Sequence, residues 1–383
     1  MSRINVMKPW MGSEEILALS EVIMSGWVAQ GPKVAQFERE FASAMQAEHA
    51  VATSNCTTAL HLALIVAGVA VGDEVIVPSF SFIATANAPT YVGARPIFID
   101  VDPVTGCVTA DGVAAAVTER TRAVIVVDQG GVPVDLDSIR AVCDPLGIVV
   151  IEDAACGAGS TYGARPVGAG AVLAAWSFHP RKLLTTGEGG MLTTSNAEWA
   201  ERAGRLREHA MSVSASDRQA SVLAPAEEYL EIGFNYRMTD MQAAVGIVQL
   251  GRLPEMVRKR REIADRYTAA LAGIDGLRPV SDPRWGTTNY QSYWVEVGEE
   301  YPVDREALLL QLAEAGVSAR RGIMSAHLQP AYAGSPSLRV PLPVSEHLTS
   351  TTLILPLYHQ LEAAQQAIVI AALLTPITVV RHG

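Results

Sequence analysis

The chain has 383 residues, of which 49% are hydrophobic and 18% are charged, and its formal net charge is −11. This composition is typical of a globular protein with a large buried interior and argues against a disordered chain. Nucleic acids and anionic membranes attract basic surfaces, so the negative charge argues against either one as the main partner. At this length we expect one larger and one smaller domain, because a single core rarely extends so far.

The cysteines and apolar runs bear on metal binding and cellular location. Four cysteines, at positions 56, 107, 143 and 156, form neither a CxxC pair nor another metal-ligand spacing, so we expect no metal. The N-terminus has no signal-peptide pattern, which predicts reduced thiols in the cytoplasm. The longest apolar runs, such as residues 367–374, are too short to span a bilayer, so we expect no membrane segment.

Short apolar strands alternate with helical patterns through the first two-thirds of the chain. The predicted strands are residues 74–78, 96–100, 123–127 and 148–152, and the predicted helices are residues 57–69, 83–92, 111–117 and 135–146. Continuous apolar strands suit a sheet that is buried on both faces, as parallel sheets are. The alternation therefore predicts an α/β sandwich with a mostly parallel central sheet.

The pattern changes after Thr239. Two helices are predicted at residues 240–250 and 256–271, and Leu253-Pro254 separates them. They are followed by a strand at residues 293–297, a helix at residues 305–315 and a last helix from Leu361. We assign residues 1–250 to an N-terminal segment with the large domain, and residues 251–383 to a smaller α+β domain. The polar, irregular stretch at residues 211–229 is predicted to be a mobile loop.

Three segments have residue types that indicate chemistry, and each lies where a predicted strand ends or a predicted helix begins. Ligands collect at the carboxyl ends of strands in open α/β sheets. In the first segment, residues 54–61, small polar residues open an amphipathic helix whose unpaired backbone N–H groups suit an anion. An ordinary helix N-cap has the same pattern, so this segment alone leaves both interpretations open.

The second segment places Glu152 and Asp153 directly after a buried apolar strand. A carboxylate at that depth needs a partner, and a protonated pyridine nitrogen would be a good one, because the ion pair makes the ring an electron sink. A carboxylate that caps the next helix or pairs with an arginine is an equally good alternative. We assign the role to Asp153, which lies one residue further out than Glu152.

The third segment contains Lys182, which follows an apolar strand and precedes the glycine-rich residues 187–190. The chain has 25 arginines but only four lysines. Arginine stays protonated and cannot form a Schiff base, so a retained lysine indicates a need for a titratable amine. Lys8 lies near the terminus, Lys33 in a predicted loop, and Lys259 on a charged, solvated helix face. The alternative for Lys182 itself is a surface lysine in a loop.

Other well-known catalytic motifs fit the chain less well. The sequence contains no GxxxxGK[ST], HExxH or GxSxG pattern. Gly157 and Gly159 look like half of a dinucleotide-binding motif, but the third glycine stands at position 163, one residue too late. We therefore discount that motif.

With these segments in place, the chain resembles the DegT/StrS-type family of sugar aminotransferases, which depend on pyridoxal phosphate (PLP) and have the aspartate-aminotransferase fold type I. The resemblance covers nearly the whole sequence, in order. It is carried by residues 25–32, 37–38, 55–64, 72–82, 152–155, 177–182, 186–190, 235–244, 321–324, 327–332 and 355–358. It implies a large PLP-binding α/β/α sandwich with a smaller C-terminal α+β domain.

The resemblance implies roles for individual residues that match the family pattern. Lys182 would form the Schiff base with PLP and move the proton between the substrate and the cofactor. Asp153 would pair with the pyridine nitrogen. The backbone amides of Cys56 and Thr57, together with the hydroxyl of Ser177, would bind the phosphate.

Further roles concern the ring, the second subunit and the substrate. Phe82 would stack on the ring, although a phenylalanine is more often a core residue. Asn235 would reach the phosphate bound by the neighbouring subunit, which implies a homodimer with a shared active site; a turn residue before the next helix is its alternative. Candidates for binding a substrate diphosphate are Lys33, Arg237, Arg320 and Arg321, with His327 from a matching segment as a further substrate residue. A solvated pair is an equal alternative for Arg320 and Arg321.

Three positions depart from the commonest family pattern. Cys156 stands where many relatives have a glutamine that bonds the cofactor's 3-hydroxyl, and cysteine is the weaker donor. Ala158 and Asp128 each stand where a histidine is expected. Some relatives also carry the cysteine, so we expect the chain to keep its activity. The three departures leave the identity of the substrate open.

The reaction that the resemblance implies is a transamination. Glutamate or glutamine would give its amine to PLP, and the resulting pyridoxamine phosphate (PMP) would aminate a keto group of a nucleotide-linked sugar or related polyol in secondary-metabolite or surface-glycan biosynthesis. One alternative is a PLP enzyme that acts on a non-sugar ketone. Another is a non-catalytic or regulatory member of the fold, against which the presence of both Lys182 and Asp153 argues. Relatives that use PLP for deoxygenation usually lack this lysine.

Overall fold

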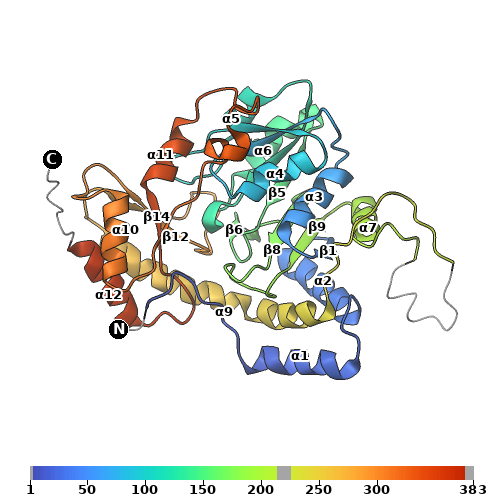
Figure 1. Cartoon of the computed structure of the whole chain (residues 1–383), viewed down its shortest axis with the longest axis horizontal. Coiled ribbons are helices and arrows are strands. Elements are labelled where there is room, and N and C mark those ends of the chain that lie inside the picture. Colours follow the sequence, from blue (N-terminus) through green and yellow to red (C-terminus); the bar gives the residue numbers. More distant parts are fainter. Residues whose placement is uncertain (1–2, 214–225, 376–383) are drawn as a thin grey trace.

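The computed structural model describes residues 3–213 and 226–375, and it is built around one large sheet (Figure 1). The strands of this sheet are β1 (His49–Thr53), β2 (Glu74–Pro78), β3 (Arg95–Ile99), β4 (Thr121–Val127), β5 (Val149–Asp153), β8 (Leu173–Ser177) and β9 (Gly190–Thr194). Within the described residues their order is β1-β9-β8-β5-β4-β2-β3. Strands β3, β2, β4, β5 and β8 are parallel to one another, and β9 is antiparallel to both β8 and β1.

The predicted strands of the large sheet are confirmed. Strand β2 has the predicted bounds, and the bounds of β3, β4 and β5 differ from the prediction by at most two residues. These strands are almost wholly buried, as continuous apolar runs between two helical layers must be. The mostly parallel sheet is confirmed as well.

Helices cover both faces of the sheet. The covering helices are α2 (Pro32–Met45), α3 (Cys56–Val66), α4 (Ile83–Tyr91), α5 (Ala110–Ala116), α6 (Leu136–Cys143), α7 (Ala197–Leu206) and α9 (Asp240–Leu271). Along β4, Val124 and Val126 pack into the core under α2, α5, α6 and α9, whereas Ile125 packs into the core under α3, α4 and α7. Because neighbouring side chains of a strand point to opposite faces, one strand contributes to two cores. The predicted α/β/α sandwich is therefore confirmed.

Helix α9 is continuous, which corrects the prediction of two helices separated near Pro254. It begins after Thr239, whose hydroxyl accepts the Gln242 N–H while the Gln242 side chain accepts the Thr239 N–H. Proline costs the helix one hydrogen bond, but the buried Leu253 and Met256 beside it stay packed in the main core. The predicted domain boundary, between residues 250 and 251, falls inside this helix, and the division into two domains stays a prediction.

The C-terminal part forms a second, antiparallel sheet with the order β10-β12-β14-β13. Its strands are β10 (Leu277–Pro279), β12 (Tyr293–Val297), β13 (Arg320–Arg321) and β14 (Thr352–Leu355), and its helices are α10 (Arg305–Glu314), α11 (Pro343–Thr351) and α12 (Ala363–Leu374). The predicted strand at residues 293–297 and the two predicted helices are confirmed within two residues. A small ribbon of β6 (Thr161–Tyr162), β7 (Arg165–Pro166) and β11 (Gly286–Thr287) connects this part to the large sheet.

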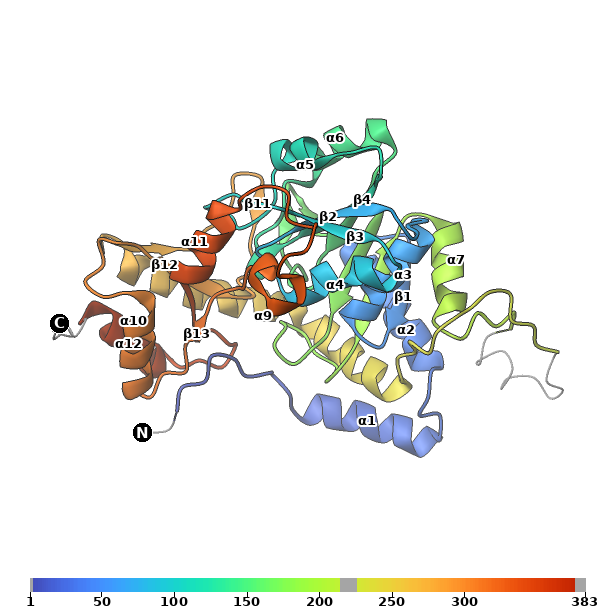
Figure 2. The same ribbon diagram turned by 45° about the horizontal axis from the view of Figure 1, so that its top comes forward.

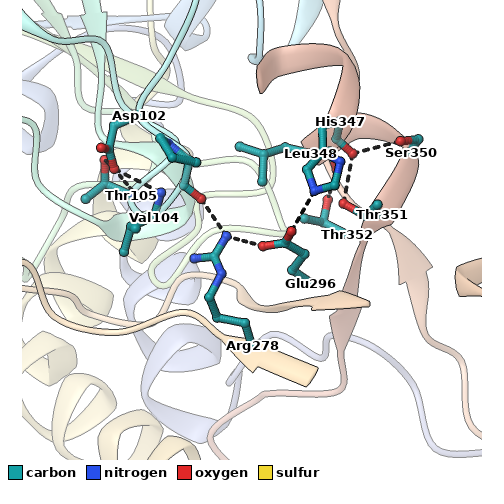
Figure 3. A network of polar contacts seen from close by, with 11 residues as sticks. Asp102, Val104, Thr105, Arg278, Glu296, His347, Leu348, Ser350, Thr351 and Thr352 are labelled. Carbon is teal, nitrogen blue, oxygen red and sulfur yellow. Dashed lines mark hydrogen bonds and ion pairs between the residues drawn. The ribbon is translucent and has the colours of Figure 1, made fainter. Parts of the chain in front are cut away.

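A polar network also joins the second sheet to the loop after β3 (Figure 3). Arg278 of β10 donates to the carbonyl of Pro103 at 2.6 Å and pairs with Glu296 of β12. Glu296 in turn bonds His347 Nε2 of α11 at 2.7 Å. Asp102 shapes the loop by accepting two of its backbone N–H groups. The second sheet is thus held against the large one by charge-assisted contacts.

Two predictions concern surface and membrane segments. Of the predicted loop at 211–229, residues 214–225 lie outside the described part, and Met211 and Tyr229 at its ends form an isolated antiparallel bridge. In the described part of the chain, no helix combines the length and the apolar character needed to cross a membrane.

Candidate active site

The predicted site residues gather at the carboxyl ends of the large sheet's strands. Asp153 is the last residue of β5, and Ser177 is the last residue of β8. Helix α4 begins directly after Phe82, which follows β2, and Lys182 lies in the turn between β8 and β9. Parallel strands bring their carboxyl ends to one edge of a sheet, which explains why residues far apart in sequence meet here.

Asp153 is held by hydrogen bonds at the bottom of this site. Its carboxylate accepts the Thr85 hydroxyl at 2.8 Å and the Ala155 N–H at 3.2 Å, and the sulfur of Cys56 lies 3.9 Å from it. Only 5% of the residue is exposed. Burial raises the pKa of Asp153, and the Thr85 bond and the charge of Lys182 offset only part of that rise. The side chain is therefore in place for a cationic partner.

Lys182 lies beside two cysteines. Its Nζ donates to Cys156 Sγ at 3.1 Å. Burial lowers the pKa of Lys182, but the contact with Cys156 and the charge of Asp153 outweigh burial and the net shift is upward. Burial also raises the pKa of the Cys56 thiol well above its usual range, with the charge of Asp153 adding to the effect. Cys56 is therefore a neutral thiol near neutral pH, and Lys182 carries a positive charge.

The start of α3 forms a cradle for an anion. Asn55 caps the helix by accepting the Thr58 N–H at 2.9 Å, which leaves the first-turn N–H groups of Cys56 and Thr57 without helical partners. Gly190 of β9 lies in register between Ser177 of β8 and Thr53 of β1. A Cβ on Gly190 would stand 2.4 Å from the backbone carbon of Asn55, so only glycine permits this close approach. The cradle and the Ser177 hydroxyl therefore lie at one edge.

Phe82 and Asn235 lie at the rim of the site. Phe82 is 62% exposed, which excludes the core alternative and leaves its ring free to stack on a ligand. The segment of Asn235 lies next to the cradle, because the Ser54 N–H donates to the Tyr236 carbonyl at 2.8 Å. Asn235 is exposed and forms an isolated bridge with Glu208. The stacking and cross-subunit roles of these residues stay predictions.

The predicted cationic substrate residues are in different surroundings. Lys33 is the second residue of helix α2, not a loop residue, and its Nζ lies 3.8 Å from Glu21. Arg321 is exposed and pairs with Glu306 of α10. Arg237 is partly buried beside the cradle segment. Their roles toward substrate stay predictions, and Arg237 follows Tyr236, whose carbonyl accepts the Ser54 N–H beside that cradle.

Arg320 and His327 differ in their accessibility. Arg320 is exposed, and burial, Arg181 and Arg3 together lower its pKa, which places it among like charges on the Lys182 side. His327 is buried and bonds the Ser79 hydroxyl at 2.5 Å. Arg320 is thus accessible to solvent and His327 is not, and the substrate roles of both residues stay predictions.

Several residues of the site gave no signal in the sequence. Thr85 supports Asp153 from inside α4, one of many threonines in helices. Asn289 donates to the carbonyls of Cys156 and Ala158 at 2.7 and 2.8 Å, and Gln291 donates to the Arg181 carbonyl at 2.6 Å. The buried Arg260 holds the segment of residues 289–291 by donating to the Tyr290 and Gln291 carbonyls, both at 2.8 Å. The Asn289 and Gln291 contacts connect positions more than a hundred residues apart.

The residues present fit PLP. The first-turn N–H groups of α3 suit its phosphate, and Phe82 offers an open aromatic face. Lys182 supplies the amine for its aldehyde, while the buried Asp153 suits a protonated ring nitrogen. Among the described residues, no three His, Cys, Asp or Glu side chains are grouped as a metal site would require.

Comparisons with known proteins agree with this geometry. The chain matches the DegT/DnrJ/EryC1/StrS aminotransferase family over residues 9–374. TlmJ, an aminotransferase from Streptoalloteichus hindustanus, is 39% identical over 96% of this chain and 97% of its own, with a TM-score of 0.88. DesV from S. venezuelae, solved with a ketimine intermediate, is 31% identical over 97% of this chain and 98% of its own, also with a TM-score of 0.88.

A third relative has been solved with the cofactor in two states. Spr1654 from Streptococcus pneumoniae, a candidate sugar aminotransferase, is 27% identical over 97% of this chain. The match covers 98% of the Spr1654 chain in the PMP form, with a TM-score of 0.91, and 97% of it in the PLP form, with a TM-score of 0.90. The predicted family, fold class and cofactor are thereby confirmed. The chain belongs to the DegT/DnrJ/EryC1/StrS aminotransferase family, and it is a PLP-dependent aminotransferase.

Proposed function

We propose that this enzyme moves an amino group from glutamate or glutamine to the keto group of a sugar or related polyol. The observation that supports it most is the meeting of Lys182, Asp153 and the α3 cradle at one sheet edge. A nucleotide-linked keto sugar is the acceptor we favour, in secondary-metabolite or surface-glycan biosynthesis. The similarity to Spr1654, described as a candidate sugar aminotransferase, supports a sugar acceptor, and the ketimine intermediate bound in DesV supports amine transfer.

Each residue has a physical task in this proposal. When bound, PLP supplies an electron sink for the bonds at the amine-bearing carbon. Asp153 keeps the ring nitrogen protonated, because a buried carboxylate favours a neighbouring cation. Lys182 holds the aldehyde and, once released, carries the proton between the substrate carbon and the cofactor. The N–H groups of Cys56 and Thr57 and the Ser177 hydroxyl anchor the phosphate.

The acceptor would meet cationic residues at the mouth of the site. Arg320 lies among like charges near Arg181, and Arg237 lies in the segment beside the cradle. Either guanidinium can bind a diphosphate in a bidentate manner. Lys33 and Arg321 would first have to give up their pairs with Glu21 and Glu306. We therefore favour Arg237 and Arg320 as the residues that recognise the substrate's negative charge.

We further propose a cytoplasmic homodimer that shares its active sites through Asn235. Helix α1 (Ser13–Ser25) lies along α9 at the margin of the molecule (Figure 2). Its outer face exposes Ile16, Leu17 and Met24 by 68%, 65% and 84%. A helix face this apolar suits burial against a second copy of the chain.

The experiment that tests the reaction is a visible spectrum of purified enzyme before and after addition of glutamate or glutamine. Wild type loaded with PLP is expected to lose its visible band as the cofactor takes up the amine. Lys182→Ala should show no amine-dependent change, whereas Lys259→Ala, on α9 over the Trp10 ring, should behave as wild type. Failure of the wild type to bind supplied PLP would favour the regulatory alternative. Amine uptake followed by rejection of every keto sugar would favour a non-sugar ketone.

A further inference from the structure

Asp128 and Glu152 form a pair of buried carboxyl groups behind Asp153. Asp128 follows the last residue of β4, and Glu152 lies in β5, where Val127 is in register with Asp153. Side chains alternate along a strand, so Glu152 points to the sheet face opposite Asp153. The Asp128 carboxyl lies on the same face of the sheet as Glu152. A Cβ built on Gly157 would be 2.8 Å from Asp128 Oδ2 and 2.6 Å from Val167, which belongs to the core on that face.

Each carboxyl has one satisfied and one unsatisfied oxygen. Asp128 Oδ1 accepts the Val134 N–H at 3.1 Å, and Glu152 accepts the backbone N–H of Gly168. Asp128 Oδ2 and Glu152 Oε2 are buried and, within the described part of the chain, receive no hydrogen bond. The exposed fractions of the two residues are 0% and 2%. A buried carboxylate oxygen without a donor is costly, so a proton between the two groups would remove the cost at both ends.

The charges around the pair are all acidic. Glu152 and Asp153 act on Asp128 from β5, and the Cys107 thiol faces Asp128 from the loop after β3. Among the described residues, no arginine, lysine or histidine pairs with either carboxyl. Burial raises the pKa of Asp128 well above its usual range, and Glu152 raises it further. Burial likewise raises the pKa of Glu152, to about 7. Of the two, Asp128 faces more negative charge and is the better proton carrier.

We propose that Asp128 is protonated in the folded enzyme and donates a hydrogen bond to Glu152, as a positioning residue for Asp153 and Cys156. The bond ties the ends of β4 and β5 together where the Asp128 N–H already donates to the Asp153 carbonyl at 3.3 Å. The turn that follows, with the Gly157 N–H bonded to the Ala154 carbonyl at 2.9 Å, carries Cys156 toward Lys182. Asp128 stands where family resemblance predicts a histidine, and an aspartate can donate at this position only while it is protonated.

A proton shared by the two carboxyls makes the stability of the fold sensitive to rising pH. Both carboxyls have a higher pKa when folded than when unfolded, so the folded protein binds more protons than the unfolded protein. Stability contributed by the pair is then fully present below the unfolded pKa values of 3.8 and 4.5, and it is lost as the pH rises from there through the folded pKa values, which for Glu152 is about 7. The catalytic consequence for Asp153 rests on the function proposed above, whereas the shared proton itself does not.

The test compares the thermal midpoint of PLP-loaded wild type with that of Asp128→Asn and Glu152→Gln. An amide keeps an N–H donor between the two groups but has no proton to lose. Between about pH 6 and about pH 9, wild type should lose roughly 2 to 5 °C more than either variant. Asp137→Asn, an exposed carboxylate at the start of α6, is the matched control and should keep the wild-type slope.

An infrared spectrum tests the proton directly and needs no turnover. Wild type near neutral pH should show the carbonyl stretch of a protonated, buried carboxyl group, and Asp128→Asn should lack it. Parallel slopes in wild type and both amide variants, or a wild-type spectrum without that band, would overturn the proposal. If the variants fail to fold, the wild-type band and its loss with rising pH still decide the matter. Neither readout depends on transamination, so a wrong substrate or donor would leave this test intact.

Discussion

The amine of Lys182 donates a hydrogen bond to the sulfur of Cys156 across 3.1 Å. Cys156 lies in the turn after β5, and Lys182 lies in the turn after β8, so the contact joins the two strand ends that carry the site. Asn289 holds the Cys156 carbonyl from the C-terminal part of the chain. The lysine therefore starts from a position defined by three separate segments.

The Cys156 contact can be tested by removing the sulfur. In Cys156→Ala, Lys182 loses its hydrogen-bond acceptor, and we expect the rate of amine uptake from glutamate to fall about 2- to 10-fold, the equivalent of one hydrogen bond. Cys156→Ser keeps an acceptor and should recover much of the loss. Single-turnover absorbance would measure both rates. A Cys156→Ala enzyme as fast as wild type would show that the contact is dispensable.

Loss of the Asp153 charge and loss of its hydrogen bond from Thr85 should slow amine uptake by different factors. Asp153→Asn removes the carboxylate, and we expect amine uptake to slow by about 10²-fold or more, as for loss of a group that acts on the reacting centre. Thr85→Val removes only the 2.8 Å hydrogen bond and should cost about 2- to 10-fold. Thr90→Val, at the exposed end of α4, is the control. Equal losses for Asp153→Asn and Thr85→Val would contradict a direct role of the Asp153 charge.

The close approach at Gly190 predicts opposite effects of two glycine substitutions. In Gly190→Ala the new Cβ would stand 2.4 to 2.7 Å from the backbone of Asn55 and Cys56, so β9 or α3 must shift. We expect a loss of about 1–3 kcal/mol in the free energy of unfolding, together with weaker PLP binding. Gly204→Ala in α7 meets nothing within 4 Å and should stabilise by about 0.5–1 kcal/mol. Urea unfolding and PLP titration would measure both, and an unchanged PLP affinity in Gly190→Ala would refute the cradle.

Glu74 predicts a loss of stability in acid. Burial raises its pKa, but bonds from Thr118, Arg339 and Arg120 outweigh burial and lower the pKa to about 2. Because this folded pKa lies below the unfolded value of 4.5, the stability is present above pH 4.5 and is lost as the pH falls toward 2.

The size of the Glu74 effect follows from the same shift. We expect Glu74→Gln to lower the free energy of unfolding by roughly 2–4 kcal/mol at neutral pH and to flatten its decline in acid. Thermal unfolding at several pH values would measure it, with the exposed Glu119→Gln as the control. If Glu74→Gln and wild type lose stability in parallel below pH 4.5, the ion-pair interpretation fails.

Local patterns in the sequence determined much of the architecture and the identity of the central residues. The apolar runs predicted the parallel strands β2, β3, β4 and β5 within two residues, because burial on both faces requires continuous apolar side chains. The small polar residues at 54–61 predicted the start of α3 to within one residue but left open whether it is an anion site or an ordinary N-cap. The scarcity of lysine and the surrounding turn residues singled out Lys182. Each of these signals is contained in a short stretch of chain.

Long-range packing decided the rest. The bond from Thr85 to Asp153 and the bond from Asn289 to the Cys156 carbonyl join residues on different elements, and Asp128 and Glu152 are buried at the ends of neighbouring strands. Helix α9 continues through Pro254, against its local signal, because its neighbours are buried in the core. Such contacts depend on strand register and helix packing, which no short window of sequence contains. The sequence by itself therefore named the candidate reacting groups, whereas only the tertiary structure determined what holds them in place.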